Sequence, residues 1–286
     1  MQQYDVIHND ESRSYWASIL VRLKLHQQAT TLRKLQHCLH NTNPTDHSHI
    51  SQIKLIEIDD SIQKIKSLRD KFRKHYVASA KNPNQSTNIY SDYTPRYQIP
   101  SLIGTEGVGS AIYFKCYQQF FADEWQFHSR NRRPPRDPVN VVLSLSYTLL
   151  QHLCQQAIYS VGFDPYHGLL HSQSYGRQSL ACDFVELQRS TIDFWVWELF
   201  DQAVLDSADF RISDETRYPC ELLKSGRSKF YKAFAAIRPN LTKTALSHAW
   251  LWQNRLQRNH CHQDTSSVQP SLSFISHHPE APPPPL

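Results

Sequence analysis

Two carboxylates one helical turn apart are the first feature of this chain that suggests chemistry. Residues 179–205 form an apolar run with large hydrophobic side chains on every side of the expected helix, so this helix should be buried. Asp183 and Glu186 nevertheless lie three residues apart in it, which places them on one face with Cβ atoms about 5–6 Å apart. Burying such a pair without a partner is costly, so a positive group must meet it.

Two kinds of positive partner fit this pattern. The polar stripe continues through Arg189 and Asp193, so Arg189 could neutralise the carboxylates in an ordinary internal salt-bridge network. A divalent cation could also bind there, because hard carboxylate oxygens suit Mg²⁺ or Mn²⁺. The residues of this helix alone leave both interpretations open.

Two further candidates lie outside this helix, and each has a structural alternative. His171 lies in the turn-rich segment GFDPYHGLLHSQSYGR, where a single histidine is more often a packed or surface residue than a ligand. His167 precedes it by four residues, as in a zinc helix, but Gly168 between them disfavours that helix and no metalloprotease glutamate lies beside His167. Glu106 lies where a glycine-flanked turn enters a helix, so helix capping is its ordinary role.

A basic loop, HSRNRRPPRDPVN, suggests contact with phosphates. Its arginines fall close together, and three prolines stiffen the backbone around them. Guanidinium groups on a rigid loop suit phosphate oxygens, although a solvated basic turn would show the same pattern. The arginines are Arg130, Arg132, Arg133 and Arg136.

The segments that must position these groups are predicted to be helical. The chain has only 7 glycines in 286 residues, and most of them fall between residues 104 and 176, where tight turns or close approaches are expected. Apolar residues at three- and four-residue spacing over 12–40 and 58–76 predict an antiparallel helical hairpin. Further helices are expected over 104–122, 139–161, 179–205, 227–237 and 241–259.

These patterns predict an all-α fold in three parts. Residues 1–100 hold the helical hairpin and a loop over 81–100 that leads into the core. Residues 101–263 form the helical catalytic core with the candidate metal site. Residues 264–286 lack apolar periodicity and end in a proline run, which is typical of a disordered tail.

Composition excludes several classes of protein. No apolar run approaches the ~20 residues of a membrane helix, and the N-terminus lacks the order of a signal peptide, so a cytoplasmic protein without a membrane partner is expected. The 6 cysteines include no C-x-x-C pair, which argues against a zinc knuckle and a disulfide scaffold. The net charge of +5 favours polyanions only weakly.

Four motifs in one order resemble the CRISPR-associated integrase family, the prokaryotic endonucleases of spacer acquisition. They are TEG with YF, then RNRRPPRDPVN with LSLSYTLL, then GFDPYHGLLHSQSYGR, and finally SLACDFVELQR. The resemblance implies a helical catalytic domain that binds one divalent metal ion, Mg²⁺ or Mn²⁺. By this resemblance the metal ligands are Glu106, His171 and Glu186, and Asp183 is the adjacent catalytic carboxylate that supports them.

The resemblance also implies a reaction and partners. The 3′-hydroxyl of a short foreign DNA fragment would attack the CRISPR repeat, while water as the nucleophile would give DNA cleavage. Positive side chains would contact the DNA backbone, and a small CRISPR-associated adaptation protein would join the complex. The implied DNA-binding residues are Arg130, Arg132, Arg133, Arg136, Arg189, Lys224 and Arg227.

Three departures from the family pattern qualify this expectation. The chain enters directly at the helical part, without the β-rich N-terminal domain through which two copies pair in the family, so a homodimer is doubtful. Phe194 follows Asp193 where the family usually has Asp-Arg, and Gly109 and Ser110 replace the expected alanines after Glu106. The alternative function is a truncated, catalytically impaired DNA-binding or assembly subunit of the adaptation complex.

Overall fold

The computed structural model describes residues 2–41, 52–79, 98–131, 133–171, 174–213 and 219–261, and most of these are helical. The predicted all-α class is therefore confirmed. The helices are α1 (Gln2–His8), α2 (Asp10–Asn41), α3 (Gln52–Ser79), α4 (Ile99–Tyr117), α5 (Pro138–Ser160), α6 (Ser179–Glu186), α7 (Arg189–Asp201) and α8 (Lys224–Cys261). Short elements between them are the 3₁₀ turns η1 (Gln118–Phe120), η2 (Asp123–Trp125) and η3 (Ser207–Asp209) and the strands β1 (Phe210–Ile212) and β2 (Cys220–Leu222).

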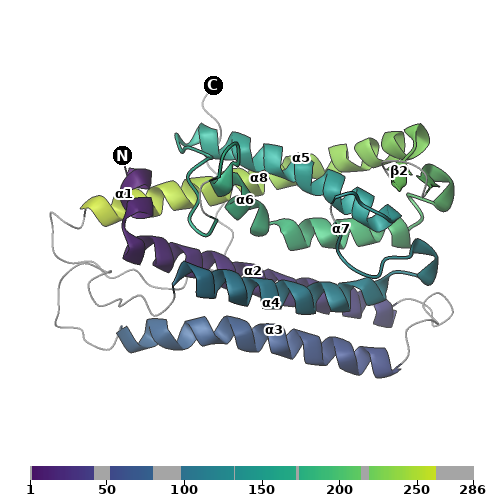
Figure 1. Cartoon of the computed structure of the whole chain (residues 1–286), viewed down its shortest axis with the longest axis horizontal. Coiled ribbons are helices and arrows are strands. Elements are labelled where there is room, and N and C mark those ends of the chain that lie inside the picture. The colour runs from purple at the N-terminus through teal and green to yellow at the C-terminus, as the bar shows by residue number, and fades with distance from the viewer. Residues whose placement is uncertain are drawn as a thin grey trace.

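One layer of the molecule consists of α2, α3 and α4 (Figure 1). α3 runs antiparallel to α2, which confirms the predicted hairpin, and α4 packs against both. α2 can continue from Asp10 to Asn41 because its sequence contains neither glycine nor proline. Its apolar side chains, including Leu20, Leu25 and Leu32, are buried in the core.

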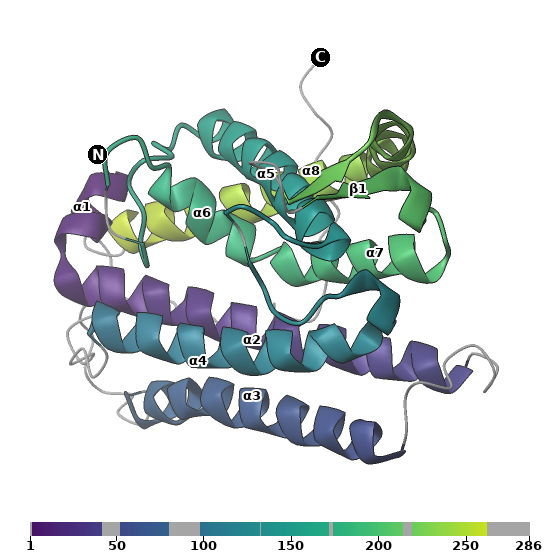
Figure 2. The same ribbon diagram turned by 45° about the vertical axis from the view of Figure 1, so that its right-hand side comes forward.

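A second layer consists of α5 to α8, and α2 borders it as well (Figure 2). α5 begins sharply because the Asp137 carboxylate accepts the N–H of Asn140 at 2.8 Å and Pro138 occupies the first helical turn. The buried apolar side chains of both layers form one core. Since α2 contacts α4 on one side and α6 and α7 on the other, polar residues on α2 can reach groups from both layers.

The single helix predicted over 179–205 is wrong, because the structure has two helices there. The N–H groups of Leu187 and Gln188 bond to the carbonyls of Phe184 and Val185, three residues back, which tightens and ends α6. Gln188 leaves helical geometry at φ −124°, ψ −2°, and α7 restarts at Arg189. The break contains neither glycine nor proline, so the apolar pattern of the sequence does not indicate it.

The two helices predicted over 227–237 and 241–259 are also wrong, since α8 runs through Pro239 as one helix. Proline removes a backbone donor and frees the carbonyl four residues earlier. Pro239 and Ala235 are both exposed, so water can bond that carbonyl. The antiparallel β1–β2 pair, with Phe210 opposite Leu222, was not predicted either.

Several sequence predictions lie outside the described residues. The expected loop over 81–100 is described only from residue 98, and the expected tail over 264–286 is not described. The division into residues 1–100 and 101–263 stays a prediction. Among the helices that the structure describes, none is both long and apolar enough to cross a lipid bilayer.

Candidate active site

Glu106 is partly buried and faces α2, because α4 packs closely against α2. A Cβ atom at Gly109 would lie 2.2 Å from Cδ2 of the fully buried Leu25, so a side chain at residue 109 would force Leu25 to move. The hydroxyl of Ser110 donates a hydrogen bond to Oε1 of Glu106 at 2.9 Å. α4 begins at Ile99, about two turns earlier, so Glu106 does not cap this helix.

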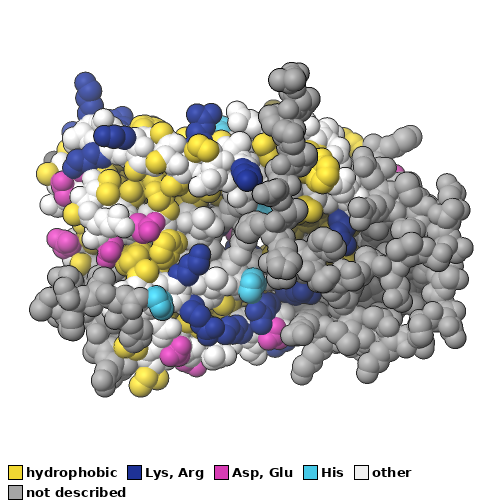
Figure 3. Space-filling view, turned by 180° about the vertical axis from the view of Figure 1, so that it is seen from behind, with side chains coloured by type: hydrophobic (Ala, Val, Ile, Leu, Met, Phe, Trp, Pro, Cys, Tyr) yellow, Lys and Arg dark blue, Asp and Glu magenta, His cyan; other side chains and the backbone are white. Residues whose placement is uncertain are grey.

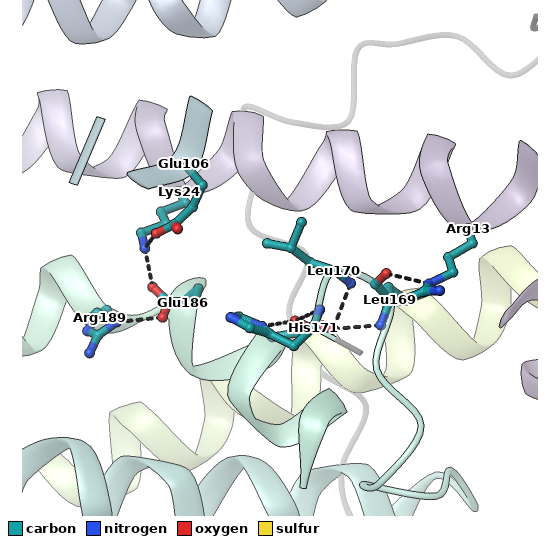
Figure 4. A network of polar contacts seen from close by, with 9 residues as sticks. Arg13, Lys24, Glu106, Leu169, Leu170, His171, Glu186 and Arg189 are labelled. Atoms are coloured by element: carbon teal, nitrogen blue, oxygen red, sulfur yellow. Dashed lines mark hydrogen bonds and ion pairs between the residues drawn. The ribbon is translucent and has the colours of Figure 1, made fainter. Parts of the chain in front are cut away.

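The two carboxylates of Glu106 and Glu186 meet at one ammonium group. Lys24 of α2 forms an ion pair with Oε1 of Glu106, and its Nζ lies 2.6 Å from Oε2 of Glu186. Figure 4 shows Lys24 between the two carboxylates, which come from α4 and α6. The side chain of Lys24 is only 4% exposed, so this cation is part of the interior. Residues far apart in the chain thus converge on a single positive charge.

Glu186 has a second positive partner across the helix break. Nη1 of Arg189 lies 2.5 Å from Oε1 of Glu186, so the internal ion pair predicted as one alternative is present. Burial alone would raise the pKa of Glu186, but the charges of Arg189 and Lys24 and their hydrogen bonds outweigh burial and hold that pKa well below its ordinary range. Glu186 is therefore ionised at neutral pH.

Asp183 organises the loop that carries His171. Its Oδ2 accepts the N–H groups of Leu169 and Leu170 at 2.7 and 3.1 Å, and its Oδ1 lies 2.6 Å from Nδ1 of His171. The Asp183 side chain is fully buried. Because Nδ1 faces Asp183, Nε2 is the ring nitrogen left for a ligand. Asp183 lies one turn before Glu186 on α6, and in the view of Figure 4 the His171 ring extends from its loop toward Glu186.

The N-terminal helices fix the other side of the same loop. Arg13 of α2 donates a hydrogen bond from Nε to the carbonyl of Leu169 at 2.9 Å (Figure 4). Gln3 of α1 donates to the carbonyl of Asp164 at 2.8 Å and accepts the N–H of Asp164 at 2.8 Å. A Cβ at Gly168 would lie 2.7 Å from the carbonyl oxygen of His171 and 2.7 Å from Cβ of Ser179 on α6, so only glycine fits between the loop and α6. The position of His171 therefore depends on α1, α2 and α6 together.

A buried polar chain continues from Arg189 away from the carboxylate pair. The Arg189 guanidinium lies 4.3 Å from the ring centre of Tyr147, and the hydroxyl of Tyr147 bonds Oδ1 of Asp193. Tyr117 donates a hydrogen bond to the carbonyl of Asp193 at 2.7 Å. Burial raises the pKa of Asp193 to about 6, although the bond from Tyr147 and the charge of Arg189 oppose that rise. The four polar residues of this stripe therefore lie in three settings. Asp183 holds the His171 loop, Glu186 and Arg189 pair with each other, and Asp193 bonds the two tyrosines.

The predicted DNA-binding residues divide by exposure. Arg133, Arg136, Lys224 and Arg227 are exposed. The Arg130 guanidinium is bonded inside the chain to Oδ1 of Asn140 at 2.7 Å and Oγ of Ser144 at 3.1 Å. The Arg189 side chain is 11% exposed and pairs with Glu186, and Arg132 lies outside the described residues.

Another basic group, which was not predicted, lies between α2 and α3. The space-filling view from behind shows Lys and Arg side chains gathered on one part of this face (Figure 3). Arg69 of α3 lies 3.1 Å from Nδ1 of His26 on α2. Burial first, and then the charges of Arg69, Arg22 and Lys66, lower the pKa of His26. Positive side chains of α2 and α3 thus lie near one another here, although Arg69 also pairs with Asp70 at 2.8 Å.

The donor chemistry of the site suits a divalent cation. In the described part of the chain, no three His, Cys, Asp or Glu side chains stand close enough together to enclose a metal ion as they are. Glu106 and Glu186 nevertheless already bind one cation between them, and Oε2 of Glu186 is a buried oxygen without a well-directed hydrogen bond. Two hard carboxylates with a neighbouring imidazole are ligands that Mg²⁺ and Mn²⁺ accept.

Sequence reasoning missed the residues that complete this site, above all Lys24. One signal was available: Lys24 falls on the buried stripe of α2, three residues after Val21 and four before Gln28, all of which are buried. A lysine on the apolar side of a helix needs a buried anion. Arg13 and Tyr147 gave no comparable signal. Arg13 bonds the backbone carbonyl of Leu169, and Tyr147 bonds Asp193 of α7, far away in the sequence.

Comparison with known proteins identifies relatives of this chain. The family model for the CRISPR associated protein Cas1 matches residues 1–236. A CRISPR-associated endonuclease Cas1 of Thermodesulfovibrio yellowstonii is 46% identical over 136 residues, which cover 48% of this chain and 42% of that protein. A CRISPR-associated endonuclease Cas1 of Leptospira interrogans is 34% identical over 164 residues, or 54% of this chain and 59% of that protein. The matched part is thus about half the length of these curated relatives.

Solved structures share the fold at low sequence identity. A Cas1 protein from Thermotoga maritima matches with a TM-score of 0.67 at 20% identity, over 90% of this chain and 69% of that one. A casposase bound to its integration product matches with a TM-score of 0.62 at 20% identity, over 89% of this chain and 64% of that one. These likenesses show that the helical arrangement is a recurrent fold.

Proposed function

Because this chain belongs to the Cas1 family of CRISPR-associated proteins, we propose that it carries the catalytic site of a divalent-metal-dependent DNA endonuclease and integrase of spacer acquisition. One structural observation supports this most strongly. Glu106 and Glu186, from separate helices, share one cation position, and Asp183, one helical turn before Glu186 on α6, holds His171 through Nδ1. In this proposal Glu106, His171 and Glu186 hold Mg²⁺ or Mn²⁺.

The bound ion would polarise the scissile phosphodiester and stabilise negative charge on the attacking and leaving oxygens. The protein's own part is mainly positioning. Asp183 fixes the His171 ring with Nε2 as the ligand nitrogen, and Ser110 orients Glu106. Arg189 keeps Glu186 ionised and ready to bind a cation. No side chain needs to act as a dedicated general base.

The substrates in this proposal are DNA molecules. A short foreign fragment supplies a 3′-hydroxyl that attacks a phosphodiester of the CRISPR repeat, which forms a new phosphodiester and releases the 3′-hydroxyl of the interrupted strand. With water in its place, the same bond is hydrolysed. Among the predicted contacts, the exposed Arg133, Arg136, Lys224 and Arg227 suit phosphate oxygens best, because their charges face solvent. The basic group between α2 and α3 is a further candidate, since like charges held together favour a polyanion.

The proposed setting is a prokaryotic cell. The curated relatives come from prokaryotes, and one solved neighbour with a TM-score of 0.69 belongs to a partial Cas6-RT-Cas1–Cas2 complex. We therefore include a small adaptation partner of the Cas2 kind and a cytoplasmic location in the proposal.

Cleavage of branched DNA tests this function. The purified chain with Mn²⁺ should cut the substrate, and Glu186→Gln should lower the rate by about 100-fold or more because a metal ligand is lost. Glu124→Gln is the matched control, since Glu124 is an exposed glutamate of η2 and no part of the proposed site. Equal cleavage by the Glu186→Gln variant and the unaltered chain would contradict the enzymatic role. DNA binding without cleavage would favour an assembly subunit.

A further inference from the structure

Lys24 is a buried cation whose two partners come from different helices. Its ammonium contacts Glu106 of α4 and lies 2.6 Å from Oε2 of Glu186 on α6, while its own backbone belongs to α2 (Figure 4). A buried lysine is costly to desolvate, and only paired anions compensate for that cost. The ammonium therefore holds three helices together at the point where their carboxylates would otherwise repel each other.

The charges of this group balance as the structure stands. Glu106 and Glu186 contribute two negative charges, and Lys24 and Arg189 contribute two positive charges. Adding a divalent cation to the same buried group would leave two uncompensated positive charges, which a poorly hydrated site disfavours. Displacing one of the two side-chain cations reduces this excess from +2 to +1, so binding of the ion favours the departure of one of them.

Lys24 is the cation that can leave. Arg189 is fixed on two sides, because its guanidinium bonds Glu186 and lies over the ring of Tyr147. Lys24 carries a single ammonium on a flexible four-carbon stem, and its partners are the two carboxylates that the proposed metal would use. Ion and ammonium compete for the same oxygens.

We propose that Lys24 is the resident counter-cation of this site, and that a divalent ion binds by displacing its ammonium from Glu106 and Glu186. This inference rests on the proposed function, since it concerns the same carboxylates. It assigns Lys24 a positioning role: the ammonium holds the carboxylates in place before the metal binds and lowers the apparent metal affinity by competition.

Substitution of Lys24 distinguishes the two effects of its ammonium, which are competition with the metal ion and stabilisation of the metal-free protein. In Lys24→Met the ammonium is lost and the length of the side chain is nearly kept, so the metal-free protein should melt at a lower temperature than the unaltered chain. Mn²⁺ should then bind at least about tenfold more tightly, which corresponds to about 1.4 kcal/mol. Mn²⁺ titrations followed by electron paramagnetic resonance and by melting temperature measure both effects without an activity assay.

Two further variants serve as controls. Lys24→Arg keeps the positive charge, so its Mn²⁺ affinity should not exceed that of the unaltered chain. Lys229→Met removes another lysine that bridges two carboxylates, with Nζ at 2.8 Å from Asp206 and 2.7 Å from Asp209, outside the site. It should leave Mn²⁺ affinity unchanged. If Lys24→Met does not fold without metal, Lys24→Gln replaces it in the same comparison.

The outcomes distinguish this inference from the proposed function. If the unaltered chain binds Mn²⁺, Glu186→Gln does not, and Lys24→Met binds no more tightly than the unaltered chain, the displacement proposal fails while the metal site stands. If neither the unaltered chain nor any variant binds Mn²⁺, both proposals fail. Tighter binding in Lys24→Met together with unchanged binding in Lys229→Met supports displacement.

Discussion

Nδ1 of His171 lies 2.6 Å from Oδ1 of Asp183, and this contact fixes which face of the imidazole is available. The same carboxylate accepts the N–H groups of Leu169 and Leu170, so loop and ring are held by one buried group. The carboxylate of Asp183 is therefore used to hold the His171 loop. Glu106 and Glu186, in contrast, share the ammonium of Lys24 as their partner.

Replacing Asp183 by asparagine tests this supporting role. The amide NH₂ would face backbone N–H groups that need an acceptor, so Asp183→Asn should lower the free energy of unfolding by about 2–3 kcal/mol. Mn²⁺ affinity should fall by about 10–100-fold, because His171 loses its orienting partner. Urea unfolding and Mn²⁺ titration measure the two effects. Asp164→Asn, at a partly exposed carboxylate of the same loop, should change stability by at most about 1 kcal/mol.

Gly168→Ala tests whether the loop needs its close contact with α6. The added Cβ would lie 2.7 Å from the His171 carbonyl oxygen and 2.9 Å from the backbone carbon of Ser179, neither of which can move alone. The change should cost about 1–3 kcal/mol in thermal unfolding. Gly104→Ala is the control, since nothing lies near its Cβ and α4 should gain about 0.5–1 kcal/mol. Similar melting temperatures for the two variants would show that the loop is not tightly packed.

The pH dependence of stability tests the buried Asp193. Because its pKa is raised to about 6, the folded state binds a proton that the unfolded state, with a pKa near 3.9, has already released. The stabilisation from this proton is complete below about pH 4 and is lost as the pH rises through about 6. The free energy of unfolding of the unaltered chain, minus that of Asp193→Asn, should therefore decrease between pH 4 and pH 6. A flat difference curve would contradict the assigned protonation.

Salt dependence of DNA binding tests the exposed arginines of the 130–136 loop. Replacing Arg133 and Arg136 together by glutamine should weaken binding at low salt and reduce the slope of log K against log[salt] by about 1–2. Fluorescence anisotropy with a labelled duplex measures the slope. Lys64→Gln is a control at an exposed lysine of α3 that pairs with Asp60. An unchanged slope in the double variant would remove these arginines from the DNA interface.

The sequence allowed the helical class and the identity of the main carboxylates to be predicted, because both leave local signals. Apolar spacing predicted α2 with α3, and the polar stripe within an apolar run marked Asp183 and Glu186 as buried anions. The break after Glu186 left no signal, since it depends on how α6 and α7 pack and involves neither glycine nor proline.

The contacts between site residues that lie far apart in the chain could not be predicted from the sequence either. Lys24 and Glu106 are 82 residues apart, and their contact depends on the close packing of α2 and α4 at Gly109. In the sequence, Gly109 and Ser110 stood out only because they replace the alanines that the family pattern has after Glu106. In the structure Gly109 permits that packing and Ser110 donates a hydrogen bond to Glu106.

A crystal of this chain grown with Mn²⁺ tests the central claim most directly, because anomalous scattering locates the ion independently of activity. We expect one strong peak bound by the carboxylates of Glu106 and Glu186 and by Nε2 of His171, with the Lys24 ammonium withdrawn from both carboxylates. A crystal grown in saturating Mn²⁺ in which Lys24 still bridges Glu106 and Glu186, with manganese bound elsewhere or not at all, would contradict the account.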